Sequence, residues 1–528
     1  MQNTTPGSEI NQQLKQVAGL FRSGDSARAM SLLTALSKAH PDDVAVLRML
    51  GISLAQQGHF EPAERSLARA AELQETSAMA ASDHASALLS LNRFDAALST
   101  LLNRQQFLED VPSVKDRATF WFNLGRAYKQ TGQASEAKQP LLNTLDIQPD
   151  HYGALISLGD VYKALGNAVD AARCFRRAIA ANPADGTAWW SLSNLKADGF
   201  SDAEFEQLKQ LQGAGRRPLQ QQVMFEFAMA SASDQRDLID KAFRHYRAGN
   251  QLARQREPWN PGQFSHWLKT LQNSVDKTPI PDRPQQWTGP RPIFIISLPR
   301  SGSTLVEQVL AAHSQVTAAS ELPWVPQLVA QASARQASGL ANWLTTQSGG
   351  EWEALGKEYL QKCSHWTQET DVFTDKLPGN LPYIGAILKM LPQALVVGVR
   401  RDAMDVCWSC YRQLLMGGSE FLYDMESLAA YWRDFESHMD FWEQRMPDRV
   451  TTVQYEQLVS SPETETRRLL DFAGLEFEQA CLSPQKAERA VNTASALQVR
   501  EAIHTRGVGH WKRYEPQLGE LKAALGIA

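Results

Sequence analysis

The chain has 528 residues, of which 43% are hydrophobic and 21% are charged, and its formal net charge is −5. This length exceeds what one hydrophobic core usually supports, so two or three globular domains are expected. The acidic balance gives no support for binding to nucleic acid or to an acidic membrane, so an anion site requires a local concentration of Arg and Lys. The first residues contain neither a basic nor an apolar segment, and no run approaches the ~18 apolar residues of a membrane span. We therefore expect a soluble, cytoplasmic protein.

Residues 1–215 contain a repeat with a period of 34 residues. Each repeat has a Gly or Asn, followed five residues later by an Ala and, in three repeats, by a Pro seventeen residues on. These positions are Gly24, Gly58, Asn92, Gly132 and Gly166, then Ala29, Ala63, Ala97, Ala137 and Ala171, then Pro41, Pro149 and Pro183. The spacing of 40 between Asn92 and Gly132 indicates about six inserted residues within 106–117. We expect Gly and Ala where paired helices cross closely, and Pro at the end of the second helix.

This pattern resembles the tetratricopeptide repeat, whose period is about 34 residues. The two fullest repeats include Leu124-Gly125 and Leu158-Gly159, and residues 187–197 look like a sixth, partial unit or a cap. The resemblance implies an all-α solenoid with a concave groove of the kind that commonly binds peptides. The alternative is an array that only buttresses the rest of the chain or dimerises it.

Residues 216–285 predict a helical bridge with helices at 220–232, 236–255 and 261–275, because apolar residues recur there every three or four positions. Prolines at 279, 281, 284, 290 and 292 then mark a linker. No chemistry is expected in this stretch.

Residues 286–528 predict an α/β domain. Short apolar runs at 292–297, 371–374, 394–399 and 450–455 alternate with long helical segments. Strands separated by helices form a parallel sheet, and ligands then bind at the carboxyl ends of the strands.

The first candidate site follows the strand at 292–297. A turn containing Pro299, Arg300 and Gly302 leads into a helix that opens at Ser303 or Thr304. A strand, a tight turn and a helix N-terminus together cradle a phosphate. A Walker A loop would need Lys at position 303, so Arg300 would have to supply the cation and an NTP-hydrolysing site is not expected. The alternative is an ordinary turn with an incidental Arg.

The run Pro299-Arg-Ser-Gly-Ser-Thr304 resembles the 5′-phosphosulfate loop of the sulfotransferases, which use 3′-phosphoadenosine 5′-phosphosulfate (PAPS). The resemblance implies that the donor is held by Arg300, Ser301, Gly302, Ser303 and Thr304.

A second part of the family pattern follows the strand at 394–399. Arg401 and Ser409 have the family spacing of eight residues, which implies that they grip the 3′-phosphate of the donor. The neighbouring Arg400 is expected in a surface ion pair. Cys407 and Cys410 form the only close cysteine pair, and we expect them to pack on a helix face.

Further matches complete the donor site. Tyr455 resembles a tyrosine of the tyrosylprotein sulfotransferases that contacts the adenine end, although a buried strand-end Tyr is the alternative. Arg506 and Gly507 resemble the Gly-flexed loop of the cytosolic enzymes, which implies a lid over the nucleotide. Ser495 matches a Ser near the transferring sulfuryl group.

Two residues resemble the catalytic pair of the tyrosylprotein and heparan-type enzymes. Glu321 is implied as the general base and Lys376 as a catalytic cation. The alternatives are a capping or solvent carboxylate for Glu321 and an ion pair with Asp375 for Lys376. The cytosolic enzymes use His as the base, so His313, His504 and His510 compete for this role.

In this order, the motifs resemble bacterial tetratricopeptide-repeat sulfotransferases. The resemblance implies in-line transfer of a sulfuryl group from PAPS to a hydroxyl, with PAP as product and without a metal. The acceptor is open: a peptide or protein tyrosine held by the repeats, a carbohydrate or a small metabolite. A P-loop-type kinase and a non-catalytic repeat scaffold with a vestigial nucleotide site remain as alternatives.

Overall fold

The structure is a computed structural model that describes residues 6–195, 199–212, 217–256, 258–275, 277, 279–334, 339–415, 420–486, 491, 493 and 495–527. Its contacts divide the chain into two compact units, Met1–Pro183 and Ala184–Ala528. The boundaries predicted at 215 and 285 both fall inside the second unit.

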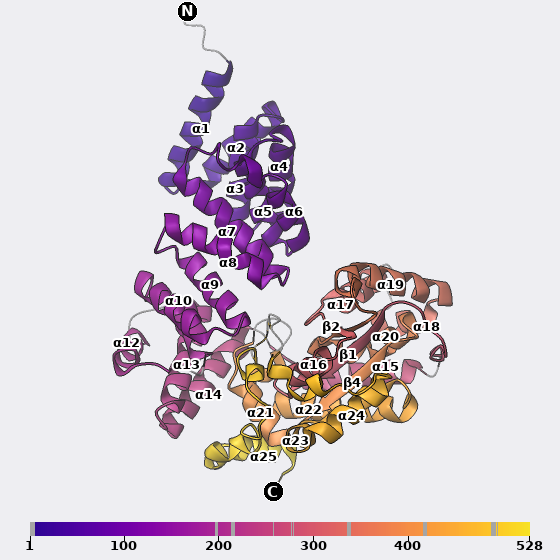
Figure 1. Ribbon diagram of the computed structural model, residues 1–528. Coiled ribbons are helices and arrows are strands. Elements are labelled where there is room, and N and C mark those ends of the chain that lie inside the picture. The colour runs from indigo at the N-terminus through magenta and orange to yellow at the C-terminus, as the bar shows by residue number, and fades with distance from the viewer. Residues whose placement is uncertain are drawn as a thin grey trace, which may run out of the picture. The chain divides into compact units, whose positions relative to one another are not determined.

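The first unit is helical, and consecutive helices pack against each other in pairs (Figure 1). Its helices are α1 (Pro6–Arg22), α2 (Ser26–Ala39), α3 (Val44–Gln56), α4 (Phe60–Leu73), α5 (Ala78–Ser90), α6 (Phe94–Leu102), α7 (Val114–Gln130), α8 (Ala134–Ile147), α9 (Tyr152–Ala164) and α10 (Ala168–Ala181). The insertion predicted within 106–117 forms the link between α6 and α7, which contains a short 3₁₀ turn (Gln105–Phe107). Each repeat proline lies two residues beyond a helix end, as predicted.

The repeated residues have two different structural roles. The alanines five residues after each Gly or Asn are fully buried where helices cross, as expected. The turn residues themselves do not lie at close crossings: a Cβ at Gly24, Gly58, Gly132 or Gly166 would meet nothing within 4 Å. They have φ between 80° and 84° instead, and Asn92 has φ 57°. The expectation of close contact is therefore wrong for these glycines, which permit a left-handed turn between helices. Close crossings occur at Gly125 and Gly159, where a Cβ would overlap Leu141 or Phe175.

The second unit begins with helices from the stretches that the sequence assigned to the end of the repeat array and to the bridge. They are α11 (Gly186–Ser193), α12 (Asp202–Gln212), α13 (Leu219–Asp234), α14 (Ile239–Arg256) and α15 (Pro261–Val275). Lys196 and Ala197, at the end of the expected sixth repeat, lie outside the described residues. Side chains of α13, α14 and α15 belong to the same hydrophobic core as Phe294 of the sheet.

The described residues of the second unit also form a parallel sheet with the order β2-β3-β1-β4-β5. The strands are β1 (Arg291–Ser297), β2 (Val316–Ala318), β3 (Val372–Asp375), β4 (Leu395–Arg400) and β5 (Val450–Gln454). Four of them were predicted, and the three-residue β2 was missed. The remaining helices are α16 (Ser303–Ala311), α17 (Trp324–Ala334), α18 (Gly339–Thr346), α19 (Gly349–Lys362), α20 (Ile384–Met390), α21 (Ala403–Tyr411), α22 (Met425–Arg445), α23 (Tyr455–Ser460), α24 (Pro462–Ala473) and α25 (Gly519–Leu525).

Both faces of the sheet are covered by helices (Figure 1). Phe294 and Ile296 of β1 point into a core shared with α15, α17, α19, α20 and α22. Ile293 and Ile295 alternate with them and point to the other face, into a core shared with α16, α23 and α24. Burial on both faces explains why β1 is a continuous apolar run.

No helix among the described residues is both long and apolar enough to cross a membrane. The five cysteines are free and buried, and Cys407 and Cys410 pack within α21, as predicted for that pair.

Candidate functional site

The candidate site lies at the carboxyl ends of the five strands. Arg300 follows β1, Glu321 follows β2, Lys376 follows β3, Arg401 follows β4 and Tyr455 follows β5. Because all strand pairs are parallel, these ends share one edge of the sheet. The order places β1 between β3 and β4, so the chain leaves β1 at the point where the strand order reverses.

The loop after β1 adopts a tight turn that leads directly into α16. Arg300 has φ 67° and Gly302 has φ 100°, and Gly302 is the N-cap residue of the helix. Ser301, Ser303 and Thr304 are buried. A Cβ at position 302 would overlap the ring of Tyr455, so this position needs glycine both for its backbone and for the ring beside it.

The Arg300 side chain bridges three segments. Its Nε donates to Ser409 Oγ over 3.4 Å, Nη1 donates to Ser495 Oγ, and Nη2 donates to Gln498 Oε1 over 2.9 Å. Burial and the neighbouring Arg401 lower the pKa of Arg300 to about 10. The side chain therefore stays charged at neutral pH, among hydroxyl and amide groups.

Arg401 lies directly beside this loop. Its Nη1 donates to the Arg300 carbonyl over 2.8 Å, and its Nη2 donates to the Gly507 carbonyl. The guanidinium stands 4.6 Å above the centre of the Tyr455 ring, and Tyr455 is itself buried. Arg401 Nε is buried and has no hydrogen-bond partner among the described residues. A buried donor of this kind is suited to an anionic ligand.

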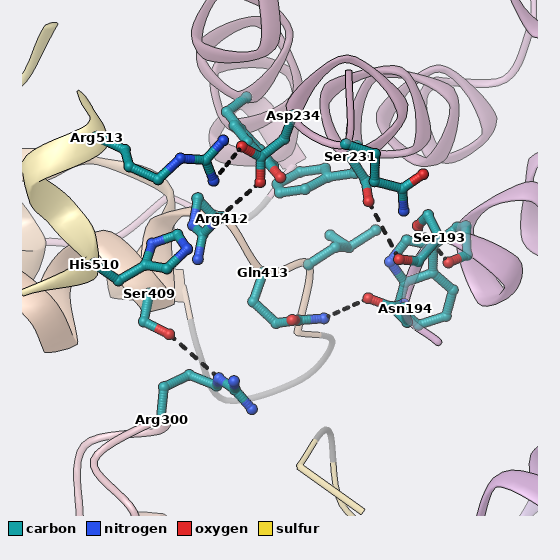
Figure 2. Close-up of a pocket in the computed structure, with 15 residues that line it drawn as sticks. Ser193, Asn194, Ser231, Asp234, Arg300, Ser409, Arg412, Gln413, His510 and Arg513 are labelled. Atoms are coloured by element: carbon teal, nitrogen blue, oxygen red, sulfur yellow. Dashed lines mark hydrogen bonds and ion pairs between the residues drawn. The ribbon is translucent and has the colours of Figure 1, made fainter. Parts of the chain in front are cut away.

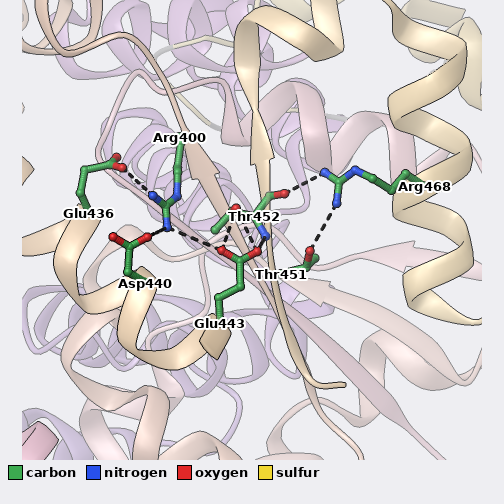
Figure 3. Close-up of polar contacts among 7 residues, drawn as sticks. All are labelled: Arg400, Glu436, Asp440, Glu443, Thr451, Thr452 and Arg468. Atoms are coloured by element: carbon green, nitrogen blue, oxygen red, sulfur yellow. Dashed lines mark hydrogen bonds and ion pairs between the residues drawn. The ribbon is translucent and has the colours of Figure 1, made fainter. Parts of the chain in front are cut away.

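The partners of Arg400, which Figure 3 shows, are carboxylates, unlike those of Arg401. It forms ion pairs with Glu436 at 2.8 Å, Asp440 at 2.6 Å and Glu443 at 3.7 Å, all from α22. The predicted ion pair of Arg400 is confirmed. By contrast, none of the ion pairs between described residues involves Arg300 or Arg401.

Glu321 and Lys376 form an ion pair across the ends of β2 and β3. The Lys376 side chain is only 2% exposed, whereas the Glu321 side chain is 43% exposed. The alternative partner, Asp375, is fully buried and accepts a 2.9 Å hydrogen bond from Tyr359 Oη instead. Burial raises the pKa of Asp375 to about 8. Of the two carboxylates, Glu321 is the one that solvent reaches.

The three competing histidines have different surroundings. His313 is buried just beyond the C-terminal end of α16, away from the loop after β1, and its ring is hydrogen-bonded to the Glu476 carbonyl at 2.8 Å. His504 lies 3.4 Å from the Glu501 carboxylate. His510 lines a cavity together with Arg300 and Ser409.

In the C-terminal segment, Ser495 and Gly507 contact the two arginines, whereas Arg506 does not. Ser495 and Gly507 are bonded to Arg300 and Arg401. The Arg506 side chain is 69% exposed and forms an ion pair with Glu501. The Arg506 side chain is therefore paired with a carboxylate and does not join Arg300 and Arg401.

A cavity of about 380 Å³ adjoins Arg300 and Ser409 (Figure 2). Its opposite wall comes from α11, at the end of the predicted repeat array, and from α13 and α14, in the stretch that was expected to hold no chemistry. Asp234 of α13 forms ion pairs there with Arg412 at 3.1 Å and Arg513 at 3.2 Å. Sequence reasoning missed this wall because its contacts join residues about 180 to 280 positions apart.

Asp405 is a second residue that was missed. Its carboxylate accepts the Gly509 amide at 2.6 Å and the Trp511 amide at 3.3 Å, so it anchors the segment after Gly507 onto α21. Its position four residues after Arg401 was the only available signal. Among the described residues, no cluster of three or more His, Cys, Asp or Glu side chains is arranged to hold a metal ion.

Comparisons with known proteins agree with this architecture. Residues 292–479 match the model of the Sulfotransferase family, and residues 20–82, 118–151 and 156–197 match tetratricopeptide-repeat models. An uncharacterized protein of Aquifex aeolicus (strain VF5) is 28% identical over 443 residues, covering 81% of this chain and 57% of that protein. The chain thus spans little more than half the length of that relative.

Two further similarities cover smaller shares of the chain. A putative protein-tyrosine sulfotransferase of Caenorhabditis briggsae is 25% identical over 224 residues, covering 42% of this chain and 80% of that protein. The sulfotransferase domain of the Synechococcus PCC 7002 olefin synthase is 23% identical, covering 44% of this chain and 90% of the solved one, with a TM-score of 0.33. The chain therefore combines tetratricopeptide repeats with a domain of the sulfotransferase family.

Proposed function

We propose that the protein transfers a sulfuryl group from PAPS to a hydroxyl acceptor. The observation that carries this proposal is the meeting of Arg300 and Arg401, neither in an ion pair with a described carboxylate, at the sheet edge that also bears the Glu321–Lys376 pair. Two adjacent guanidinium groups repel each other, so the arrangement favours an anion between or beside them.

The donor would be held at two points. Arg401 and Ser409 would bind the 3′-phosphate, and the backbone N–H groups at the start of α16 would bind the 5′ end. Tyr455 would pack against the nucleotide. The segment with Gly507 would close over the nucleotide, and Arg506 would join it after breaking its ion pair with Glu501. The donor supplies an activated sulfuryl group, whose bond to the 5′-phosphate oxygen breaks as the acceptor oxygen bonds to sulfur.

Glu321 would take the acceptor proton. Its carboxylate is partly exposed and is oriented by buried Lys376, so it combines access with a fixed position. A positioned general base contributes about 10²–10⁴-fold to rate. Lys376, Arg300 and Ser495 would stabilise the negative charge that develops around the transferring group.

For the acceptor, we favour a tyrosine in a peptide or protein. Two relatives of this chain are named protein-tyrosine sulfotransferases, one of them as putative, and arrays of tetratricopeptide repeats commonly bind peptides. A carbohydrate or small-metabolite acceptor is an outcome that an acceptor screen would reveal.

The test is transfer from labelled PAPS to a panel of peptides, glycans and phenols. Wild type should label an acceptor, and Glu321→Gln should lose about 10²–10⁴-fold in kcat while still binding PAP in calorimetry. Glu353→Gln is the matched control, since Glu353 also pairs with a lysine, at 2.7 Å, but on the exposed surface of α19. Loss of PAP binding in Glu321→Gln would remove Glu321 from the base role. Binding of ATP with Mg²⁺ in preference to PAP would favour a kinase instead.

A further inference from the structure

Glu307 is a fully buried carboxylate that has no part in the proposed reaction. It lies on α16, the helix that begins at the phosphate loop. Its Oε1 accepts the backbone N–H of Ser320 at 3.1 Å. Ser320 directly precedes Glu321, and it has φ 60°, which non-glycine residues rarely adopt. The carboxylate thus holds the residue before the proposed base in an uncommon backbone conformation.

The same oxygen has a second donor. Thr374 Oγ1, in β3, donates to Glu307 Oε1 at 3.1 Å, two residues before Lys376. The Lys376 amide then donates to the Ser320 carbonyl at 2.8 Å. One buried oxygen therefore joins three segments: the helix of the phosphate loop, the turn that bears Glu321 and the strand that leads to Lys376.

We propose that Glu307 is a positioning residue that fixes the Glu321–Lys376 pair relative to the phosphate loop. This inference rests on the proposed function, because it assigns Glu307 to the geometry of that reaction. Glu307 itself is fully buried, so we expect it to touch neither the donor nor the acceptor. Its removal would free the Ser320 backbone to leave the left-handed region, and Glu321 would move with it.

The expected effect falls on turnover rather than on donor binding. A displacement of about 1 Å at a reacting group can cost on the order of 100-fold in rate. We expect Glu307→Ala to lower kcat by about 10–100-fold at saturating substrates and to change PAP affinity by less than about 3-fold. Glu307→Gln should recover most of kcat, because its amide oxygen still accepts hydrogen bonds from both Ser320 and Thr374.

The decisive experiment repeats Glu307→Ala in a Glu321→Gln background. If Glu307 acts through Glu321, adding Glu307→Ala to Glu321→Gln should lower the remaining kcat of Glu321→Gln by less than about 3-fold. An equal loss in both backgrounds would overturn the proposal, since it would indicate a general defect. Gln308→Ala, a buried neighbour on the same helix, is the matched control for lost stability and should keep kcat within about 3-fold.

Hydrogen exchange separates this inference from the proposed function. In the full-length protein, Glu307→Ala should accelerate amide exchange in the peptide that contains Ser320, with no comparable change at the phosphate loop. Unchanged exchange at Ser320 would overturn the positioning role. Failure of the wild type to use PAPS would overturn the sulfotransferase proposal alone, because exchange still reports whether Glu307 holds the turn.

Discussion

Arg400 and Arg401 are adjacent residues with opposite surroundings. Arg400 is neutralised by three carboxylates of α22, whereas Arg401 meets two backbone carbonyls and the ring of Tyr455. Successive side chains at a strand end point to opposite sides, so only one of the two can face the phosphate loop. Arg401 is the one that contacts Arg300, which supports its assignment as the 3′-phosphate ligand.

Asp375 should make stability depend on pH. Its folded pKa is about 8, raised by burial, against about 4 for an exposed Asp. The folded state therefore keeps a proton that the unfolded state releases, so this contribution is full below about pH 4 and declines as pH rises to about 8. Tyr359, Glu307 and Lys376 are its charged or titratable neighbours.

Thermal unfolding between about pH 5.5 and 8 tests this expectation. Asp375→Asn keeps an oxygen for the Tyr359 hydroxyl but cannot titrate, so the melting temperature of the variant should fall less with rising pH than that of wild type. Identical pH profiles for the two proteins would show that Asp375 is ionised in the folded state.

Gly302, in the loop after β1, packs against the ring of Tyr455 at the start of α23. Its φ of 100° and the Tyr455 ring beside it leave no room for a side chain. Gly302→Ala should therefore displace both the loop and the ring, lowering stability by about 1–3 kcal/mol and weakening PAP binding at least about 10-fold.

Gly349→Ala provides the control for this substitution. A Cβ at Gly349, in the first turn of α19, would meet nothing within 4 Å. The stability and the PAP affinity of Gly349→Ala should therefore stay near the wild-type values. Normal PAP binding by Gly302→Ala would mean that the loop does not form the donor site.

At the level of elements, the sequence predicted those features that depend on residues close together in the chain. Four of the strands, the turn at Gly302 and the spacing of Arg401 and Ser409 were all predicted from the sequence. The strand β2 (Val316–Ala318) was not, because three residues are too few to show an alternation. The contacts of Asp405 with Gly509 and Trp511 could not be predicted either, because they join residues about 100 positions apart.

At the scale of the whole molecule, the bridge helices α13, α14 and α15 belong to the second unit. Tyr246 of α14 packs edge-on against Trp408 of α21, with ring centres 5.8 Å apart. Asn250 Nδ2 donates to the Tyr411 carbonyl over 2.8 Å, and both groups are buried. The sequence predicted the helices but not these partners, because the apolar spacing of a helix does not specify which surface it covers.

Truncated chains should show whether the second unit begins at Ala184 or at residue 286. A chain that begins at Ala184 keeps the shared core and should fold and bind PAP within about 3-fold of the full-length protein. A chain that begins at residue 286 exposes the apolar surface that α13, α14 and α15 cover, so it should aggregate or unfold. Stable folding and normal PAP binding of the shorter chain would support the boundary predicted at 285.

The central claim is that one nucleotide is held at both of its phosphate-bearing ends. Calorimetric titration of the full-length protein with PAP and with adenosine 5′-phosphosulfate, which lacks the 3′-phosphate, tests it most directly. Arg401→Ala should weaken PAP by about 10–100-fold and adenosine 5′-phosphosulfate by less than about 3-fold, while Arg400→Ala should change neither by more than about 3-fold. Equal weakening of both ligands by Arg401→Ala would contradict the account.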